Sequence, residues 1–393
     1  MATYELPSSD SPDLALLHPT QEEKVETWKL NGASWRGAMP LPIYLRRETY
    51  LENQAFTKDG GITFWILVDS TLPRNERPIL GSCESFRKRA LVARDGKVED
   101  VVSHGIGSVF CNPDYRRRGF AQRMIEELGK KLDTWNQEDR KKTDFTVLYS
   151  DIGKKFYSKF GWESFPSSHI ALAPMSSESE SALSGARSLR ADDLEELCSW
   201  DEQLLRADIA RDVPCKEIRV ALIPDLKTMQ WHHAREEFAG REMLGREPDI
   251  KGAHADCEDS SQVWCIWTRT FGSTEAGNTL NILRFFIDGE NDAVRDESEA
   301  GDDLTDLKST DQAKLHGAVA VLHAAQVEAA RWEMKDVQIW NPSSLIVLAA
   351  RQIEPSTKLI HRDDESIASL RWHGEPEERT KVEWVGNEKY AWC

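Results

Sequence analysis

Residues 113–121 read Pro-Asp-Tyr-Arg-Arg-Arg-Gly-Phe-Ala and form the most constraining stretch of this sequence. They follow a strand-like run, 107–111, and precede a run with apolar residues at helical spacing, 121–132. Backbone N–H groups at the start of a helix are unpaired and carry a partial positive charge, so they bind anions. Gly119 has no Cβ and lets an anion approach the backbone closely. The sequence therefore predicts a strand–turn–helix unit that binds phosphate, and we expect a pyrophosphate.

Composition narrows the class of protein. With 393 residues, the chain is long enough for two domains. Its 50 basic and 67 acidic residues give a net charge of −17, which argues against a nucleic-acid partner. Seven scattered cysteines without a Cys-x-x-Cys pair indicate reduced thiols. The N-terminus does not resemble a signal peptide, and no apolar run approaches the ~20 residues of a membrane span. We therefore expect a cytoplasmic protein without a membrane partner.

The first part of the chain alternates helix-like and strand-like segments. Apolar periodicity and turn signals predict helices, strands and a Ser/Glu-rich linker that begins near residue 176. We expect an N-terminal domain at 1–175, a linker at 176–188 and a C-terminal domain at 189–393. The predicted helices are 21–30, 42–53, 120–135 and 154–160, and the predicted strands are 63–69, 79–86, 101–111 and 145–150.

The second part repeats the order strand, helix, strand, short helix, strand from about residue 263 onward. Residues 103–172 have the same order, which suggests a tandem duplication. Where the first copy has its arginine turn, the second has an acidic insertion, 288–311, with a net charge of −8. Because such an insertion would repel phosphate, we expect that the second copy is degenerate and that only the first binds a cofactor.

Two further motifs accompany the arginine turn. Asn112-Pro113 stands at the end of the preceding strand, where proline removes a ladder donor and should splay the strand end. Residues 156–162, Phe-Tyr-Ser-Lys-Phe-Gly-Trp, follow a second strand. Together the motifs resemble the GCN5-related N-acetyltransferase superfamily over about residues 20–175. The resemblance implies a mixed α/β fold, with a central, mostly antiparallel sheet flanked by helices, and acetyl-CoA as co-substrate.

The resemblance also implies which residues contact the cofactor. The turn would bind the pyrophosphate of coenzyme A, and guanidinium groups there would add charge-assisted hydrogen bonds. Amides at the splayed strand end would bind pantetheine and the acetyl oxygen, and Ser150 stands where the family often has asparagine. The expected cofactor-binding residues are Val109, Phe110, Cys111, Arg116, Arg117, Arg118, Gly119, Phe120, Ala121 and Ser150.

Tyr157 is the predicted proton donor to the departing thiolate. Its phenol has a pKa near ~10, which suits that task, and it should lie about 100° around the helix from Phe156. An acceptor amine must also lose a proton, and related lysine-modifying families often carry a glutamate on the strand before the turn. That position is Gly107 here, so His104 and Glu84 are the candidate bases, with a water relay as the alternative.

The acceptor is indicated by resemblance alone. Segments 27–35, 340–342, 369–372 and 382–393 look like those of fungal lysine N6-acetyltransferases, which acetylate free L-lysine in lysine catabolism. An acceptor of this kind needs a cation for its carboxylate and acids for its α-ammonium. The alternatives are another amine, such as a polyamine or a protein, and a non-catalytic acyl-CoA-binding module. The candidate cations are Arg36, Arg46 and Arg47, and the candidate acids are Glu383 and Glu388.

No metal site is expected. The adjacent pair His232-His233 is the nearest to a ligand pattern among the ten histidines, and no cysteine or carboxylate spacing completes it.

Overall fold

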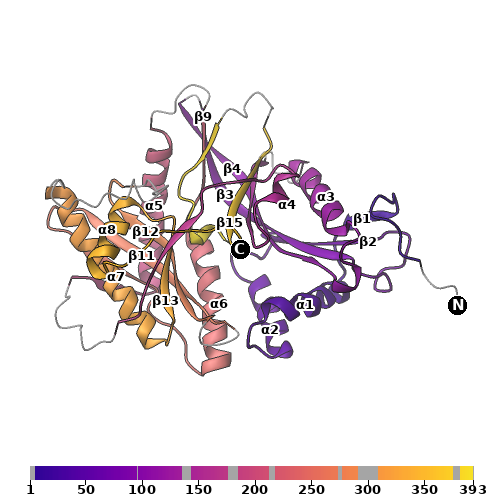
Figure 1. Ribbon diagram of the computed structural model, residues 1–393, viewed down its shortest axis with the longest axis horizontal. Coiled ribbons are helices and arrows are strands. Elements are labelled where there is room, and N and C mark those ends of the chain that lie inside the picture. Colours follow the sequence, from indigo (N-terminus) through magenta and orange to yellow (C-terminus); the bar gives the residue numbers. More distant parts are fainter. Residues whose placement is uncertain are drawn as a thin grey trace.

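Two mixed sheets lie side by side and are flanked by helices (Figure 1). The computed structural model describes residues 5–94, 96–134, 143–175, 185–211, 217–272, 277–290, 309–374 and 381–392. Most strand pairs are antiparallel, so the predicted mixed α/β class is confirmed. In the described residues no helix combines the length and the hydrophobicity that a bilayer crossing requires.

The first sheet holds the long hairpin of β3 and β4, whose strands pair from Gly81↔Cys111 to Arg94↔Lys97. β4 and β5 are parallel, and α3 connects them. The strand order is β1 (Leu14–Leu17), β2 (Ile62–Asp69), β3 (Gly81–Arg94), β4 (Lys97–Cys111), β5 (Thr143–Ser150), β15 (Ile367–Trp372) and β6 (Glu163–Ser164), with β9 (Glu217–Leu222) on β3 and β16 (Lys381–Trp384) on β9.

The second sheet is built in the same way from the second half of the chain. β11 and β12 are antiparallel, β12 and β13 are parallel, and α7 connects the parallel pair. The strand order is β14 (Ile360–His361), β7 (Ser168–Leu172), β13 (Asp336–Trp340), β12 (Thr279–Ile287), β11 (Gln262–Thr270), β10 (Gly252–Asp256) and β8 (Arg187–Leu189).

The two halves exchange strands. β7 belongs to the first half of the chain but pairs with β13 in the second sheet, and β15 belongs to the second half but pairs with β5 in the first. The predicted boundary between 1–175 and 189–393 therefore divides the sequence, but each sheet contains strands from both sides of that boundary. Of the predicted linker, 176–184 lies outside the described residues and β8 occupies 187–189. The shared strand order, with exchange at equivalent positions, is what a duplication would produce.

Helices cover both sheets and meet between them. α3 buries Met124, Ile125, Leu128 and Leu132 against the first sheet, as the apolar spacing predicted. α6 packs on α2 of the first half and on β11 of the second, so it joins the two (Figure 1). The helices are α1 (Gln21–Trp35), α2 (Leu41–Glu52), α3 (Phe120–Thr134), α4 (Lys155–Ser158), α5 (Leu194–Ile209), α6 (Leu226–Leu244), α7 (Ser309–Arg331) and α8 (Ser344–Ile353).

Candidate active site

A β-bulge opens the first sheet at the end of β4. The β3–β4 register shifts between Ser82 and Glu84, and Ser108 has a φ of 50°. Pairing of β4 with β5 ends at Ile106↔Leu148, although β4 itself continues to Cys111. Bulges twist a strand and end its pairing, and they are common beside active sites. The splay therefore begins at the bulge and not at Asn112-Pro113, as the sequence had suggested.

The arginine turn follows the open end of β4. Arg117 and Gly119 have φ values of 64° and 85°, so the backbone passes twice through the left-handed region just before α3 begins at Phe120. The side chains of Arg116, Arg117 and Arg118 are exposed, and Arg116 Nε donates to the Cys111 carbonyl at 3.2 Å. The turn thus combines the backbone N–H groups at the start of α3 with solvent-accessible guanidinium groups, as an anion site requires.

Gly119 cannot be replaced without moving its neighbours. A Cβ at this position would lie 2.6 Å from Ser9 Oγ and 3.0 Å from Ser9 Cβ. Ser9 has little freedom to withdraw, because Arg123 Nη1 donates to its carbonyl at 2.8 Å. The N-terminal segment is therefore fixed against the turn, and the turn depends on a residue without a side chain.

Gly119→Ala should weaken the binding of coenzyme A by about 10-fold or more, because the substitution combines a left-handed φ with this clash. Titration calorimetry with coenzyme A measures the change. Gly60→Ala is the matched control, since Gly60 has a φ of 81° but no atom within 4 Å of an added Cβ. Equal loss of affinity in both variants would show that the turn does not bind the cofactor.

One cavity of about 590 Å³ joins the turn to the interface of the two halves. At one end it is lined by Arg116 and Ala121, and then by the open edge of β4. At the other end it is enclosed by α2 and α6. The residues there are Tyr44, Arg47, Glu48, Trp231, Arg235 and Trp392.

Glu84 is a buried carboxyl group on the wall of this cavity. It stands opposite Gly107 in the β3–β4 ladder, so the missing side chain at position 107 leaves space beside it. Burial, and then the negative charge of Glu48, raise the pKa of Glu84 to about 8, against a hydrogen bond from Ser108 that lowers it. A carboxylate with such a pKa is a stronger base than an exposed one.

Tyr157 lines the same cavity from α4. Its side chain is buried, and burial, followed by the influence of Cys83, raises its pKa above the ordinary value. The phenol therefore stays protonated and can donate. Phe156 also lines the cavity, is half-buried, and contacts the Tyr157 ring edge-on at 5.0 Å.

Of the predicted catalytic and cofactor-binding residues outside the turn, two do not line the cavity. His104 is buried further along β4, opposite Arg87, and burial together with the charge of Arg87 lowers its pKa to about 3. It is not among the residues that line the cavity. Ser150 donates to the Gly153 carbonyl at 2.7 Å and accepts from Ile152 N at 3.3 Å, so its hydroxyl holds a turn.

Of the residues predicted to bind the acceptor, one lines the cavity and the others do not. Of the three candidate arginines, only Arg47 reaches the cavity, where its Nε donates to Glu48 at 2.9 Å. Arg36 is exposed, and Arg46 pairs with Glu242 on α6. Glu383 pairs with Arg219 at 2.9 Å on the strand edge, away from the cavity. Glu388, the remaining candidate acid, lies in the second half.

The second half has an equivalent opening, which its own chain fills. The β11–β12 register also shifts, and pairing of β12 with β13 ends at Ile282↔Ile339. Beyond that point Glu388 accepts a hydrogen bond from Phe285 N at 2.8 Å and pairs with Arg284. The C-terminal segment thus takes the position on β12 that remains open on β4. Of the acidic insertion, residues 291–308 lie outside the described residues.

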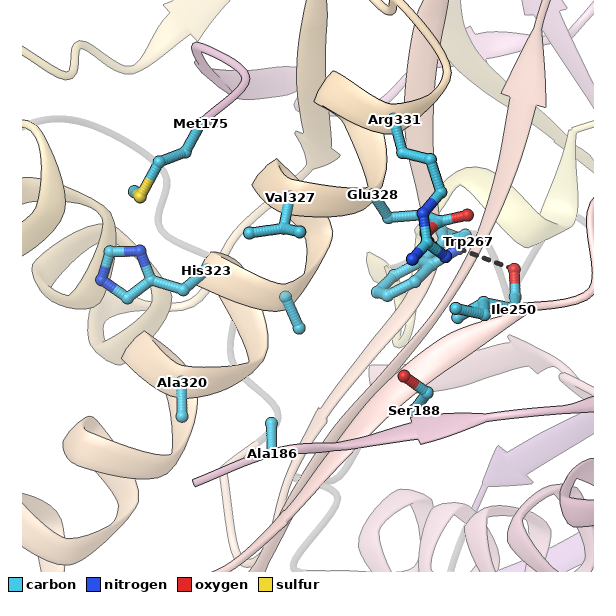
Figure 2. A pocket seen from close by; sticks show the side chains of 11 residues that line it. Met175, Ala186, Ser188, Ile250, Trp267, Ala320, His323, Val327, Glu328 and Arg331 are labelled. Carbon is cyan, nitrogen blue, oxygen red and sulfur yellow. Dashed lines mark hydrogen bonds and ion pairs between the residues drawn. The ribbon is translucent and has the colours of Figure 1, made fainter. Parts of the chain in front are cut away.

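A smaller cavity, of about 160 Å³, lies between α7 and the strands of the second sheet (Figure 2). Apolar side chains line it together with His323, Glu328 and Arg331, and the Trp267 indole donates to the Ile250 carbonyl at 3.2 Å. The carboxylate of Glu328 is bound by Arg269 and by the Trp332 indole. Because Glu328 is already paired with Arg269, this cavity offers no free carboxylate that could act as a base like Glu84.

Comparison with known proteins shows which family the chain belongs to. The model of a family described as the LYC1 GNAT-like C-terminal domain matches residues 169–393, more than half of the chain. The chain belongs to this family. It is a member of the GCN5-related N-acetyltransferase superfamily related to the fungal lysine acetyltransferases.

Two curated relatives are similar over part of their length. A protein of Yarrowia lipolytica named lysine acetyltransferase is 24% identical over 243 residues, which are 52% of this chain and 59% of that protein. An uncharacterized protein of Saccharomyces cerevisiae is 28% identical over 191 residues, 42% and 47% of the two chains. The matches thus span about half of the length of these relatives.

One solved structure shares the fold over almost the whole chain. Saccharomyces cerevisiae N-myristoyltransferase with bound myristoyl-CoA has a TM-score of 0.50 at 9% identity, covering 93% of this chain and 81% of that one. A GCN5-related N-acetyltransferase from Anabaena variabilis has a TM-score of 0.48 at 14% identity, with coverages of 92% and 73%.

Proposed function

We propose that this chain is an acetyl-CoA-dependent N-acetyltransferase that acts on the ε-amine of free L-lysine and yields N6-acetyl-L-lysine for lysine catabolism. The observation that carries the proposal is the single cavity shared by the arginine turn, the open edge of β4, Glu84 and Tyr157. It brings an anion site, a base and a proton donor to one space.

The residues present fit coenzyme A. The backbone N–H groups at the start of α3 and the exposed guanidinium groups of the turn can bind a pyrophosphate. Beyond Ile106 the β5 side of β4 has no strand partner among the described residues, so those backbone N–H groups of Val109 to Cys111 that face this side can bind the pantetheine arm. Bound acetyl-CoA would supply the activated thioester carbonyl.

Glu84 and Tyr157 account for the proton transfers. Lysine ammonium has a pKa of about 10.4, so forming the neutral amine at pH 7 costs roughly 4–5 kcal/mol. The Glu84 carboxylate accepts this proton. The nitrogen–carbon bond then forms as the carbon–sulfur bond breaks, and Tyr157 protonates the departing sulfur. The second proton released by the nitrogen restores the phenol.

Free lysine is the acceptor that the second half of the chain favours. Trp231, Arg235 and Trp392 close the cavity opposite Glu84, which suits a small molecule better than a protein segment. The relative from Yarrowia lipolytica carries the name lysine acetyltransferase, in agreement with this choice.

Incubation with labelled acetyl-CoA and an amine panel tests the proposal. Free L-lysine should be acetylated at least ~10-fold faster than spermidine or a lysine-containing peptide. If another amine is acetylated and lysine is not, then that amine is the acceptor instead of lysine. Binding of coenzyme A without turnover of any amine would instead indicate an acyl-CoA-binding module.

A further inference from the structure

Arg235 reaches the cavity from α6, in the half of the chain that carries no arginine turn. Its side chain is half-buried, and its guanidinium group lies 5.1 Å from the centroid of the Trp392 ring. An arginine stacked on an aromatic face keeps its edge N–H groups free for a planar partner. α6 and the C-terminal segment thus hold the Arg235 guanidinium group at the wall of the cavity.

The charge of Arg235 is not neutralised by the protein. Within the ranges that the structure describes, Arg235 forms no hydrogen bond and no ion pair. Glu48, the acid that influences it, is bound by Arg47 through Nε and Nη2 at 2.9 and 2.7 Å. Burial, and then the repulsion of Arg47, lower the pKa of Arg235 to about 10. The group remains charged at neutral pH and needs an anion.

Several buried cations in the described chain are paired with carboxylates, whereas Arg235 is not. A charge is costly to bury unless a partner compensates for the lost hydration. The paired examples are Arg77 with Glu23 at 2.8 Å, Lys251 with Glu236 at 3.0 Å and Arg284 with Asp201 at 2.8 Å.

The surroundings of Arg235 connect it to the base. Tyr44 lines the same cavity, and the charges of both Glu84 and Arg235 influence its phenol. The cavity therefore has a carboxyl group toward the open edge of β4 and an unpaired cation toward the second half. A ligand that matches this pattern has an amine at one end and a carboxylate at the other.

We propose that Arg235 binds the carboxylate of the acceptor and thereby selects an amino acid over amines that lack a carboxylate. The inference rests on the proposed acetyl transfer and adds to it the class of acceptor and the residue that recognises it. Arg235 was not among the three arginines that the sequence suggested, because it lies far from them along the chain and meets the cavity only after folding.

The test compares L-lysine with L-lysinamide, in which a neutral amide replaces the carboxylate. Arg235→Met should lower kcat/KM for L-lysine by ~10²–10³-fold, mostly through KM, because a desolvated charge pair is lost. Activity toward L-lysinamide should change less than about 3-fold. Arg235→Lys keeps the positive charge but not the planar guanidinium group that can donate two parallel hydrogen bonds. It should recover part of the activity toward L-lysine.

The control is Arg46→Met on α2, whose arginine pairs with Glu242 and does not line the cavity. It should leave both acceptors unaffected. Unchanged affinity for coenzyme A in Arg235→Met shows that the variant is folded. Wild-type protein that uses L-lysinamide as well as L-lysine, or an equal loss on both acceptors in Arg235→Met, would overturn the inference.

A failure of acetyl transfer can be told apart from a failure of this subsite. If the wild-type protein acetylates no amine, the proposed function is wrong. Calorimetric measurement of L-lysine binding in the presence of coenzyme A then tests whether Arg235 binds the carboxylate. Binding by the wild type and a ~10²-fold weaker affinity in Arg235→Met support the subsite. Absence of binding by the wild type rejects it.

Discussion

Glu84→Gln should reduce kcat by about 10²–10⁴-fold, because the amide keeps the shape of the side chain but cannot accept a proton. Affinity for coenzyme A should be unchanged, since the arginine turn, where we propose that it binds, is on another part of the cavity. In the wild type, kcat/KM should rise with pH until Glu84 is ionised, at about pH 8. In the variant this rise should disappear.

The same substitution should stabilise the protein at high pH. Glu84 has a raised pKa in the folded state, so folding favours its protonated form; the unfolded carboxyl group ionises near 4.5. The wild type therefore loses stability as the pH rises from 4.5 through 8, and the neutral amide of the variant removes that loss. We expect the unfolding midpoint of Glu84→Gln to exceed that of the wild type at pH 9 by several degrees and to match it near pH 5.

Glu383→Gln is the matched control, because Glu383 pairs with Arg219 outside the cavity. It should retain activity and show no such gain at pH 9. If Glu84→Gln is inactive but not stabilised at pH 9, then Glu84 does not carry a raised pKa. If it remains fully active, a water relay deprotonates the amine.

Tyr157→Phe should lower kcat by about 10²–10³-fold and leave KM for acetyl-CoA within about 3-fold of the wild-type value. The ring keeps its contact with Phe156, so the change removes the proton donor and little packing. Because burial raises the pKa of Tyr157, the wild type should show no loss of activity from phenol ionisation below pH 10. Steady-state kinetics over pH 6–10 measures both effects.

Tyr50→Phe provides the comparison, since Tyr50 on α2 contacts Phe238 and does not line the cavity. It should be as active as the wild type. An unchanged kcat in Tyr157→Phe would mean that the thiolate leaves without help from this phenol.

The features that sequence predicted are those encoded by neighbouring residues. The arginine turn, Gly119 and Tyr157 belong to short contiguous motifs with a strand before and a helix after them. β13 and β15 likewise form on short contiguous runs rich in apolar residues. Ser343 caps α8 by accepting a hydrogen bond from Ile346 N at 3.4 Å.

The features that sequence missed depend on contacts between distant segments. α6 has no amphipathic pattern, because it is buried against α2 on one side and β11 on another; His232 and Glu236 are buried on it. Arg235 and Trp392 meet only in the folded chain. The bulge at Ser108 also has no signal of its own, since a serine seldom marks a positive φ.

The exchange of β7 and β15 has a consequence for biosynthesis. The ribosome completes β5 at Ser150, but the strand that pairs with it begins only at Ile367. At about 5–20 residues per second, the nascent chain carries an open sheet edge for ten seconds or more. Such edges recruit other strands, so a chaperone that shields β5 during translation should raise the yield of active protein.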